Sequence, residues 1–329
     1  MPVRHRKNGS PDYNAANANG GPLVCTPKRL PRRLWAQAAR NAVKIEPRNY
    51  GRISRLVRIA PKLTLTPEHI AAVTDRKWPV TGVRLTVGFM DNPPVALRRR
   101  IISHMRAWNK TANIHFVESH VDPQVRIARE GGQDGGYWSY LGTEILEIPA
   151  NEQTMNLEAF TMHTADSEFH RVVRHETGHT LGFPHEHMRK DLVARIDRDK
   201  AIRFFGATQG WSPAEVRQQV LTPLDDATLI ETPHADQNSI MCYQIPGILT
   251  VDGQPIIGGL DIDASDYAFA GSLYPKPHHI AAQDADVASA AYEDTAVIEI
   301  ADGEITRIVL KRPVNSVSAG SAGSIDAGQ

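Results

Sequence analysis

Hydrophobic and polar residues alternate along residues 83–89, and this period of two predicts a half-buried β-strand. From residue 97 to residue 108, apolar residues recur at intervals of three and four, which predicts an amphipathic helix. Shorter apolar segments predict further strands at 114–117, 125–128 and 157–162. The mixture of the two periods predicts a domain of the α+β class.

A second amphipathic helix is expected from about residue 166, with its apolar face at Phe169, Val172, Val173 and Leu181. Gly182 follows directly and is a natural end for this helix, because glycine adopts the left-handed conformation that terminates helices. A third helix is predicted at 264–274, and the acidic residues between 261 and 266 are interpreted as its N-terminal cap.

Charge is distributed unevenly although the chain as a whole is neutral, with 37 basic and 37 acidic residues. Residues 1–62 carry 14 basic and 2 acidic side chains and few apolar ones. We therefore expect three parts: a basic N-terminal arm or pro-segment (1–74), a catalytic domain (75–275) and a C-terminal extension (276–329). The arm could also contact nucleic acid or a membrane, fold back on the acidic body, or be a solvated leader. No nucleic-acid partner is expected.

Two cysteines, Cys25 and Cys242, are too few for a disulfide-stapled small fold or for a structural zinc module built on four cysteines. No apolar run approaches the roughly 20 residues that cross a bilayer, so no transmembrane segment is expected. The first residues are charged and lack the apolar stretch of a secretory signal peptide.

The candidate chemistry lies at the end of the second helix, where residues 175–185 read His-Glu-Thr-Gly-His-Thr-Leu-Gly-Phe-Pro-His. His175 and His179 are four residues apart and so lie on one face of a helix, where both rings can reach a single ion. Once Gly182 has turned the chain, His185 can return as a third nitrogen ligand. Three imidazoles leave a fourth position open for water, as in a catalytic zinc site. Glu176 flanks this position and is the candidate general base.

This extended motif is that of the metzincin metallopeptidases, and its continuation resembles the astacin family. Phe183 after the glycine and Glu186 after the third histidine follow the astacin pattern, and residues 239–243 (Ser-Ile-Met-Cys-Tyr) resemble the astacin Met-turn. The resemblance implies a metzincin-type zincin fold: a twisted mixed sheet with a backing helix and an active-site helix, and a smaller irregular C-terminal subdomain that ends in a helix.

The resemblance also implies roles for individual residues. Met241 would form the hydrophobic floor beneath one catalytic Zn²⁺, and Tyr243 would stabilise the oxyanion of the tetrahedral intermediate. Glu186 would be tied to the N-terminus of the mature enzyme, or would act as a structural acid without that link. A peptide or protein substrate would lie extended along an edge strand, expected near residues 157–162.

Cys25 lies in the basic arm, and a thiolate is a good zinc ligand. One hypothesis is a latency switch, in which Cys25 occupies the fourth position of the metal until the arm is removed from a zymogen. The alternatives are a free surface thiol and a disulfide with Cys242.

The sequence thus predicts a zinc-dependent endopeptidase. The alternatives are a non-catalytic zinc- or peptide-binding module and a zinc amidase that acts on cell-wall peptides. The family is mostly secreted, although this sequence shows no recognisable signal. Beyond the catalytic domain, residues 297–300 and 305–310 flank Asp302-Gly303 and predict a β-hairpin. The Ser-, Ala- and Gly-rich residues after Pro313 are expected to be disordered.

Overall fold

The computed structural model of the chain describes residue 25 and residues 28–51, 74–131, 135–223, 236–277, 295–301 and 304–311. The chain divides into two compact units, Met1–Ile280 and Ala281–Gln329. The first unit contains every candidate site residue.

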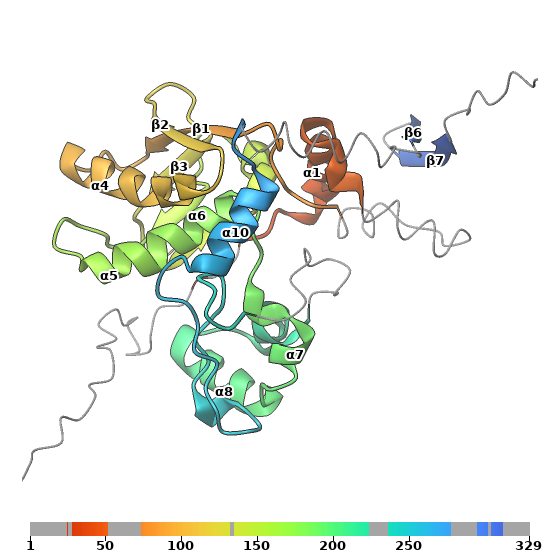
Figure 1. Cartoon of the computed structure of the whole chain (residues 1–329). Coiled ribbons are helices and arrows are strands. Elements are labelled where there is room, and N and C mark those ends of the chain that lie inside the picture. Colours follow the sequence, from red (N-terminus) through yellow and green to blue (C-terminus); the bar gives the residue numbers. More distant parts are fainter. Residues whose placement is uncertain are drawn as a thin grey trace, which may run out of the picture. The chain divides into compact units, whose positions relative to one another are not determined.

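A five-stranded mixed sheet forms the upper part of the first unit (Figure 1). Its strands are β1 (Val83–Phe89), β2 (Ile114–Glu118), β3 (Val125–Ala128), β4 (Tyr137–Ser139) and β5 (Met155–Leu157). Their order across the sheet is β2-β1-β3-β5-β4, and β4 pairs antiparallel with β5 while the other neighbours are parallel. The alternation along β1 is as predicted, because Val83, Leu85 and Val87 are buried. The α+β class and the strands near 83–89, 114–117 and 125–128 are confirmed.

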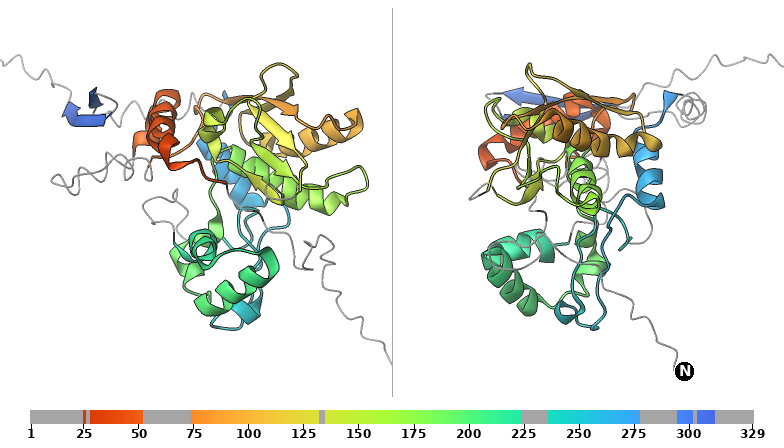
Figure 2. Two further views of the ribbon diagram at one scale, coloured as in Figure 1. Left: turned by 180° about the vertical axis from the view of Figure 1, so that it is seen from behind. Right: turned by 90° about the vertical axis from the view of Figure 1, so that its left-hand side faces the viewer.

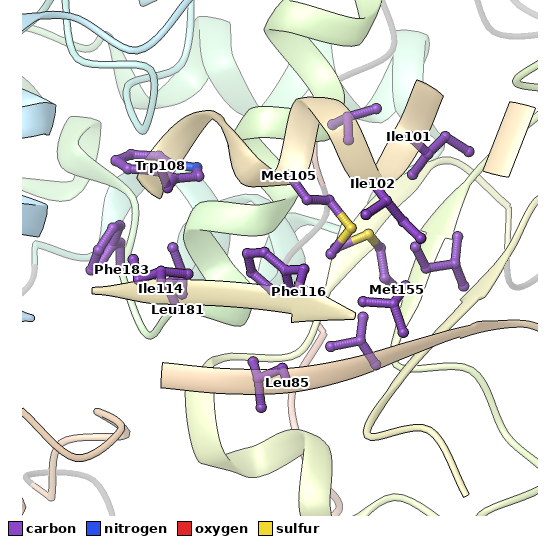
Figure 3. Packing of buried hydrophobic residues seen from close by; sticks show 14 of the residues in the cluster. Leu85, Ile101, Ile102, Met105, Trp108, Ile114, Phe116, Met155, Leu181 and Phe183 are labelled. Carbon is purple, nitrogen blue, oxygen red and sulfur yellow. The ribbon is translucent and has the colours of Figure 1, made fainter. Parts of the chain in front are cut away.

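Two helices pack along this sheet. The first is α4 (Val95–Met105), which continues into the 3₁₀ helix η3 (Arg106–Lys110). The second is one continuous helix made of α5 (Asp166–Glu168), the π-helical segment η6 (Phe169–Val173) and α6 (Arg174–Thr180). Figure 3 shows Met105 of α4 directed toward Phe116 of β2, with Leu181 and Phe183 beyond the end of α6 in the same buried cluster.

The predicted strand at 157–162 is wrong, because the strand is β5 and it ends at Leu157. Ala159 has a positive φ of 56°, and a turn closed by the Thr164 N–H and the Thr161 carbonyl follows. β5 also lies inside the sheet, between β3 and β4, so it cannot receive a substrate strand. The edge strand on this side is the three-residue β4.

The basic N-terminal segment packs on the same unit through η1 (Arg32–Leu34), α1 (Trp35–Ile45) and η2 (Pro47–Tyr50). Gln37 and Asn41 of α1 donate side-chain hydrogen bonds of 2.8 and 2.6 Å to the Glu147 carboxylate. Glu147 ends the 3₁₀ helix η5 (Gly142–Glu147), which follows β4. Residues 28–51 therefore fold back on an acidic part of the body.

The lower part of the unit is irregular and mostly helical, and α7 and α8 lie together away from the sheet in both views of Figure 2. Its described helices are η7 (Glu186–Met188), α7 (Lys190–Val193), α8 (Arg198–Gln209), α9 (Pro213–Val216), η8 (Arg217–Leu221) and η10 (Gly247–Leu249). A second hydrophobic cluster, which includes Phe205 and Val220, stabilises this part. Further along the chain lies α10 (Ala264–Leu273), close to the predicted 264–274 and begun by a capping box of Asp263 and Asp266.

The second unit contains an antiparallel pair of strands, β6 (Thr295–Ala301) and β7 (Glu304–Lys311), which confirms the predicted hairpin. The connecting residues 302–303 and the Ser-, Ala- and Gly-rich tail lie outside the described residues. Among the helices that the structure describes, none is both long enough and apolar enough to cross a membrane.

Candidate metal centre

The turn after α6 brings His185 back toward the helix that carries His175 and His179. Gly182 has φ of +92°, and a Cβ there would lie 3.0 Å from the Arg76 carbonyl oxygen, so glycine meets both the conformational and the steric demand. The Phe183 N–H donates to the Gly178 carbonyl at 2.9 Å and closes the turn.

The three imidazoles converge through their Nε2 atoms. The Nε2 of His185 lies 3.1 Å from that of His175 and 3.0 Å from that of His179. His175 Nδ1 lies 2.6 Å from the Ile240 carbonyl oxygen, and His179 Nδ1 lies 2.8 Å from the Phe183 carbonyl oxygen. Because a carbonyl only accepts, each Nδ1 carries the proton, and both Nε2 lone pairs face one point.

This donor set fits a zinc ion. Nitrogen ligands at about 2.0–2.1 Å in tetrahedral geometry lie about 3.3 Å apart, close to the separations observed here. All three histidines are buried, and burial holds the pKa values of His175 and His185 well below the ordinary value and lowers that of His179 to about 4. Neutral imidazole is the form that binds a metal ion.

Glu176 lies beside these ligands on α6 and is almost completely buried. Burial raises the pKa of its carboxyl group to about 8, against a hydrogen bond from Cys25 and the charge of Arg171, which lower it. Its Oε2 lies 3.5 Å from the Cys25 sulfur. Among the residues proposed from the sequence, Glu176 is therefore the carboxylate that the fold brings to the imidazole cluster.

The turn at Ser239–Tyr243 lies under the cluster. The Glu186 N–H donates to the Met241 carbonyl at 2.9 Å, and a Cβ on Gly178 would overlap the Met241 sulfur. Asp266 holds this turn, because its carboxylate accepts from the Ser239 hydroxyl at 2.6 Å and from the Ile240 N–H at 2.8 Å. The sequence indicated only a helix cap for Asp266 and did not predict its hydrogen bonds to this turn.

Cys25 lies at the centre of the candidate site. Its Sγ and one nitrogen from each of His175, His179 and His185 all lie within 4.8 Å of one another. The Tyr243 hydroxyl donates a hydrogen bond to the Cys25 carbonyl oxygen, and Cys25 forms a parallel bridge with Tyr137 of β4. Both cysteines are buried free thiols. The disulfide alternative is therefore wrong, and so is the alternative of a thiol on the surface.

Glu186 does not reach the metal ligands. Its carboxylate pairs with Arg189 at 2.5 Å and accepts from the Asp236 N–H at 3.3 Å. Burial raises the pKa of this group to about 7, and the charge of Arg189 opposes the rise. The structure thus places Glu186 as the anchor between η7 and the residues that precede the turn at 239–243.

His187 is also buried, but its ring serves the packing of Tyr243. The two rings stack with centroids 4.0 Å apart, and His187 Nε2 lies 3.0 Å from the Gln219 carbonyl oxygen. Burial lowers the pKa of His187 to about 3. A neutral aromatic partner therefore fixes the Tyr243 ring beside His185, at a centroid distance of 4.3 Å.

Comparison with known proteins adds an independent finding. The family model of the astacin peptidases matches residues 71–248, somewhat more than half of the chain. Zinc metalloproteinase nas-27 of Caenorhabditis elegans is 34% identical over 129 residues, which are 39% of this chain and 25% of that protein. The chain thus spans about a quarter of the length of this curated relative.

Two solved structures are also similar. A structure of myroilysin is 32% identical with a TM-score of 0.57, and the match covers 61% of this chain and 96% of that one. High choriolytic enzyme 1, a hatching enzyme zinc-protease of the medaka fish Oryzias latipes, is 22% identical with a TM-score of 0.41 and coverages of 59% and 90%.

Proposed function

The chain belongs to the astacin family of zinc metallopeptidases. We therefore propose that it is an endopeptidase, with an active site built around His175, His179 and His185. One observation carries this proposal: three neutral imidazoles direct their Nε2 atoms at a single point, with the carboxylate of Glu176 beside them. A zinc ion held there supplies a Lewis acid that polarises the scissile carbonyl and makes a water molecule more acidic.

Two side chains then handle the protons and the developing charge. Glu176 accepts a proton from the attacking water and delivers it to the leaving amine, as a general base and then a general acid. The hydroxyl of Tyr243 donates to the oxyanion of the tetrahedral intermediate once the Cys25 carbonyl, its present acceptor, has left. Met241 and the turn around it support the ligands from below.

We further propose that residues 1–74 act as a pro-segment and that Cys25 keeps the enzyme latent. The contacts of Cys25 support this role, because they involve each group assigned to the chemistry: its sulfur lies near the three histidines and Glu176, and its carbonyl engages Tyr243. A thiolate in the fourth ligand position excludes the water that the reaction needs. Removal of the segment frees Glu176 and Tyr243 together.

Substrate is proposed to bind along β4, the edge strand beside the cluster, by adding a strand to the sheet. The bridge between Cys25 and Tyr137 supports this proposal, because the pro-segment already uses the free edge of β4 in that way. The pro-segment and the substrate therefore compete for one backbone surface.

The general base is tested with Glu176→Ala in a full-length chain that also carries Cys25→Ala. We expect one bound zinc per chain by metal analysis and a loss of about 10²–10⁴-fold in kcat/KM on a peptide library. Glu130→Ala, which removes a carboxylate from the loop after β3, serves as the matched control. Substantial peptide cleavage by the metal-loaded Glu176 variant would refute the assigned role.

A further inference from the structure

A cavity of about 260 Å³ adjoins the imidazole cluster. Its lining includes His179, His185, Glu144 of η5 and Arg29 of the N-terminal segment. A substrate that replaces the segment can therefore place a side chain near both the imidazole cluster and Glu144.

The Glu144 carboxylate has one oxygen committed and one available. Its Oε1 accepts from Arg76 Nε at 3.0 Å, and among the described residues no donor is hydrogen-bonded to Oε2. The Nη1 atom of Arg76 is itself engaged, since it donates to the Thr74 carbonyl at 2.5 Å. Burial raises the pKa of Glu144, whereas the charges of Arg76 and Arg29 lower it, so a cation in this place stabilises the carboxylate. The wall of the cavity therefore favours a cationic group over an anionic one.

The N-terminal segment is basic where it lines the cavity. Residues 28–51 hold seven basic side chains and one acidic one. Lys28 places its ammonium 4.6 Å from the centre of the Trp138 ring, and Arg29 lies at the rim of the cavity, where Glu144 favours its charge. Two adjacent basic side chains thus meet two features that attract cations, an indole face and a carboxylate.

From this arrangement we propose that Glu144 is a specificity-determining residue and that the active enzyme prefers substrates with a lysine or arginine near the scissile bond. The inference rests on the proposed function, because it assigns a substrate class to the same cleft. The substrate side chain enters the cavity and donates to Glu144 Oε2, while Arg76 continues to hold Oε1. A second basic residue beside the first uses the face of Trp138.

The test uses the full-length, zinc-loaded chain with Cys25→Ala and with a recognition site for a sequence-specific protease inserted between residues 52 and 73, cut so that peptides can displace the segment. Peptide libraries vary Lys, Arg, Gln and Glu at each position on both sides of the scissile bond. We expect one position at which Lys or Arg raises kcat/KM about tenfold or more over Gln. Glu144→Gln, which can still accept from Arg76, should reduce this ratio to near one.

The matched control is Glu152→Gln, which removes an exposed carboxylate eight residues further along the chain. This variant should keep the preference for peptides that carry Lys or Arg. Equal cleavage of basic and neutral peptides, or an unchanged ratio in Glu144→Gln, would overturn the inference. Binding of the same peptides to a Glu176→Ala variant, measured by fluorescence anisotropy, separates it from the proposed function. One outcome is that no peptide is cleaved, yet basic peptides bind more tightly than neutral ones and lose this advantage in Glu144→Gln. The proposed subsite would then be supported, and the endopeptidase assignment would fail.

Discussion

At the scale of single residues, the four-residue spacing of His175 and His179 and the glycine before His185 predicted the convergence of the three rings. The contribution of Asp266 was not predictable in the same way. It follows the Met241 turn by 25 positions, and its local pattern identifies only a helix cap, which it also provides. Its bond to the Ile240 N–H depends on how α10 packs against that turn, and no local sequence rule contains this information.

Gly178 gives a prediction at this scale. An added Cβ would overlap the Met241 sulfur and lie 3.4 Å from the Trp108 ring, so Gly178→Ala overpacks the contact between α6 and the turn at 239–243. We expect a loss of about 1–3 kcal/mol in the free energy of unfolding, measured by urea denaturation. Gly206→Ala in α8, where the nearest atom is 3.4 Å away, is the matched control and should be neutral or stabilising. Equal stability of both variants would contradict the close contact.

At the scale of elements, strands with a clear period were predicted and the edge of the sheet was not. β4 has three residues, too few for an alternation to be visible, and all three are buried. The apolar residues after Leu157 suggested a longer strand, but Phe160 packs against Tyr137 and Phe169 from a turn rather than from a strand. Hydrophobicity gave the burial of these residues, whereas hydrogen bonding between distant segments decided which of them form the sheet.

The packing of α4 on the active-site helix predicts a sensitivity to acid. Burial and the charges of Arg174, His170 and Arg100 lower the pKa of His104 to about 4, and Asp166 opposes this. Between pH 6.5 and about 4 the unfolded chain therefore binds a proton that the folded chain does not, so stability falls as the pH falls through that window. Thermal unfolding of His104→Gln should show a shallower loss from about pH 6.5 to about 4.5 than the unmodified chain. If the two chains lost stability identically as the pH falls, His104 would be excluded as a cause of the acid sensitivity.

At the scale of the whole molecule, the latency proposed for the N-terminal segment predicts the behaviour of two cysteine variants. In the full-length chain loaded with Co²⁺, Cys25→Ser should lose a thiolate-to-metal charge-transfer band and gain peptidase activity of at least about tenfold, because the fourth position opens to water. Cys242→Ser should retain both the band and the latency, since Cys242 packs in the turn beneath the site. Unchanged spectrum and activity in Cys25→Ser would rule out the switch.

Two distant segments of the first unit meet just after the helix that carries His175 and His179. The Tyr274 hydroxyl donates to the Leu181 carbonyl at 2.7 Å and accepts from the Trp78 N–H at 3.1 Å. On the ribosome, these contacts must wait until translation has passed Tyr274, whereas Cys25 is translated long before that point. The segment that is proposed to inhibit the enzyme is therefore synthesised well before the centre that it would restrain can be completed.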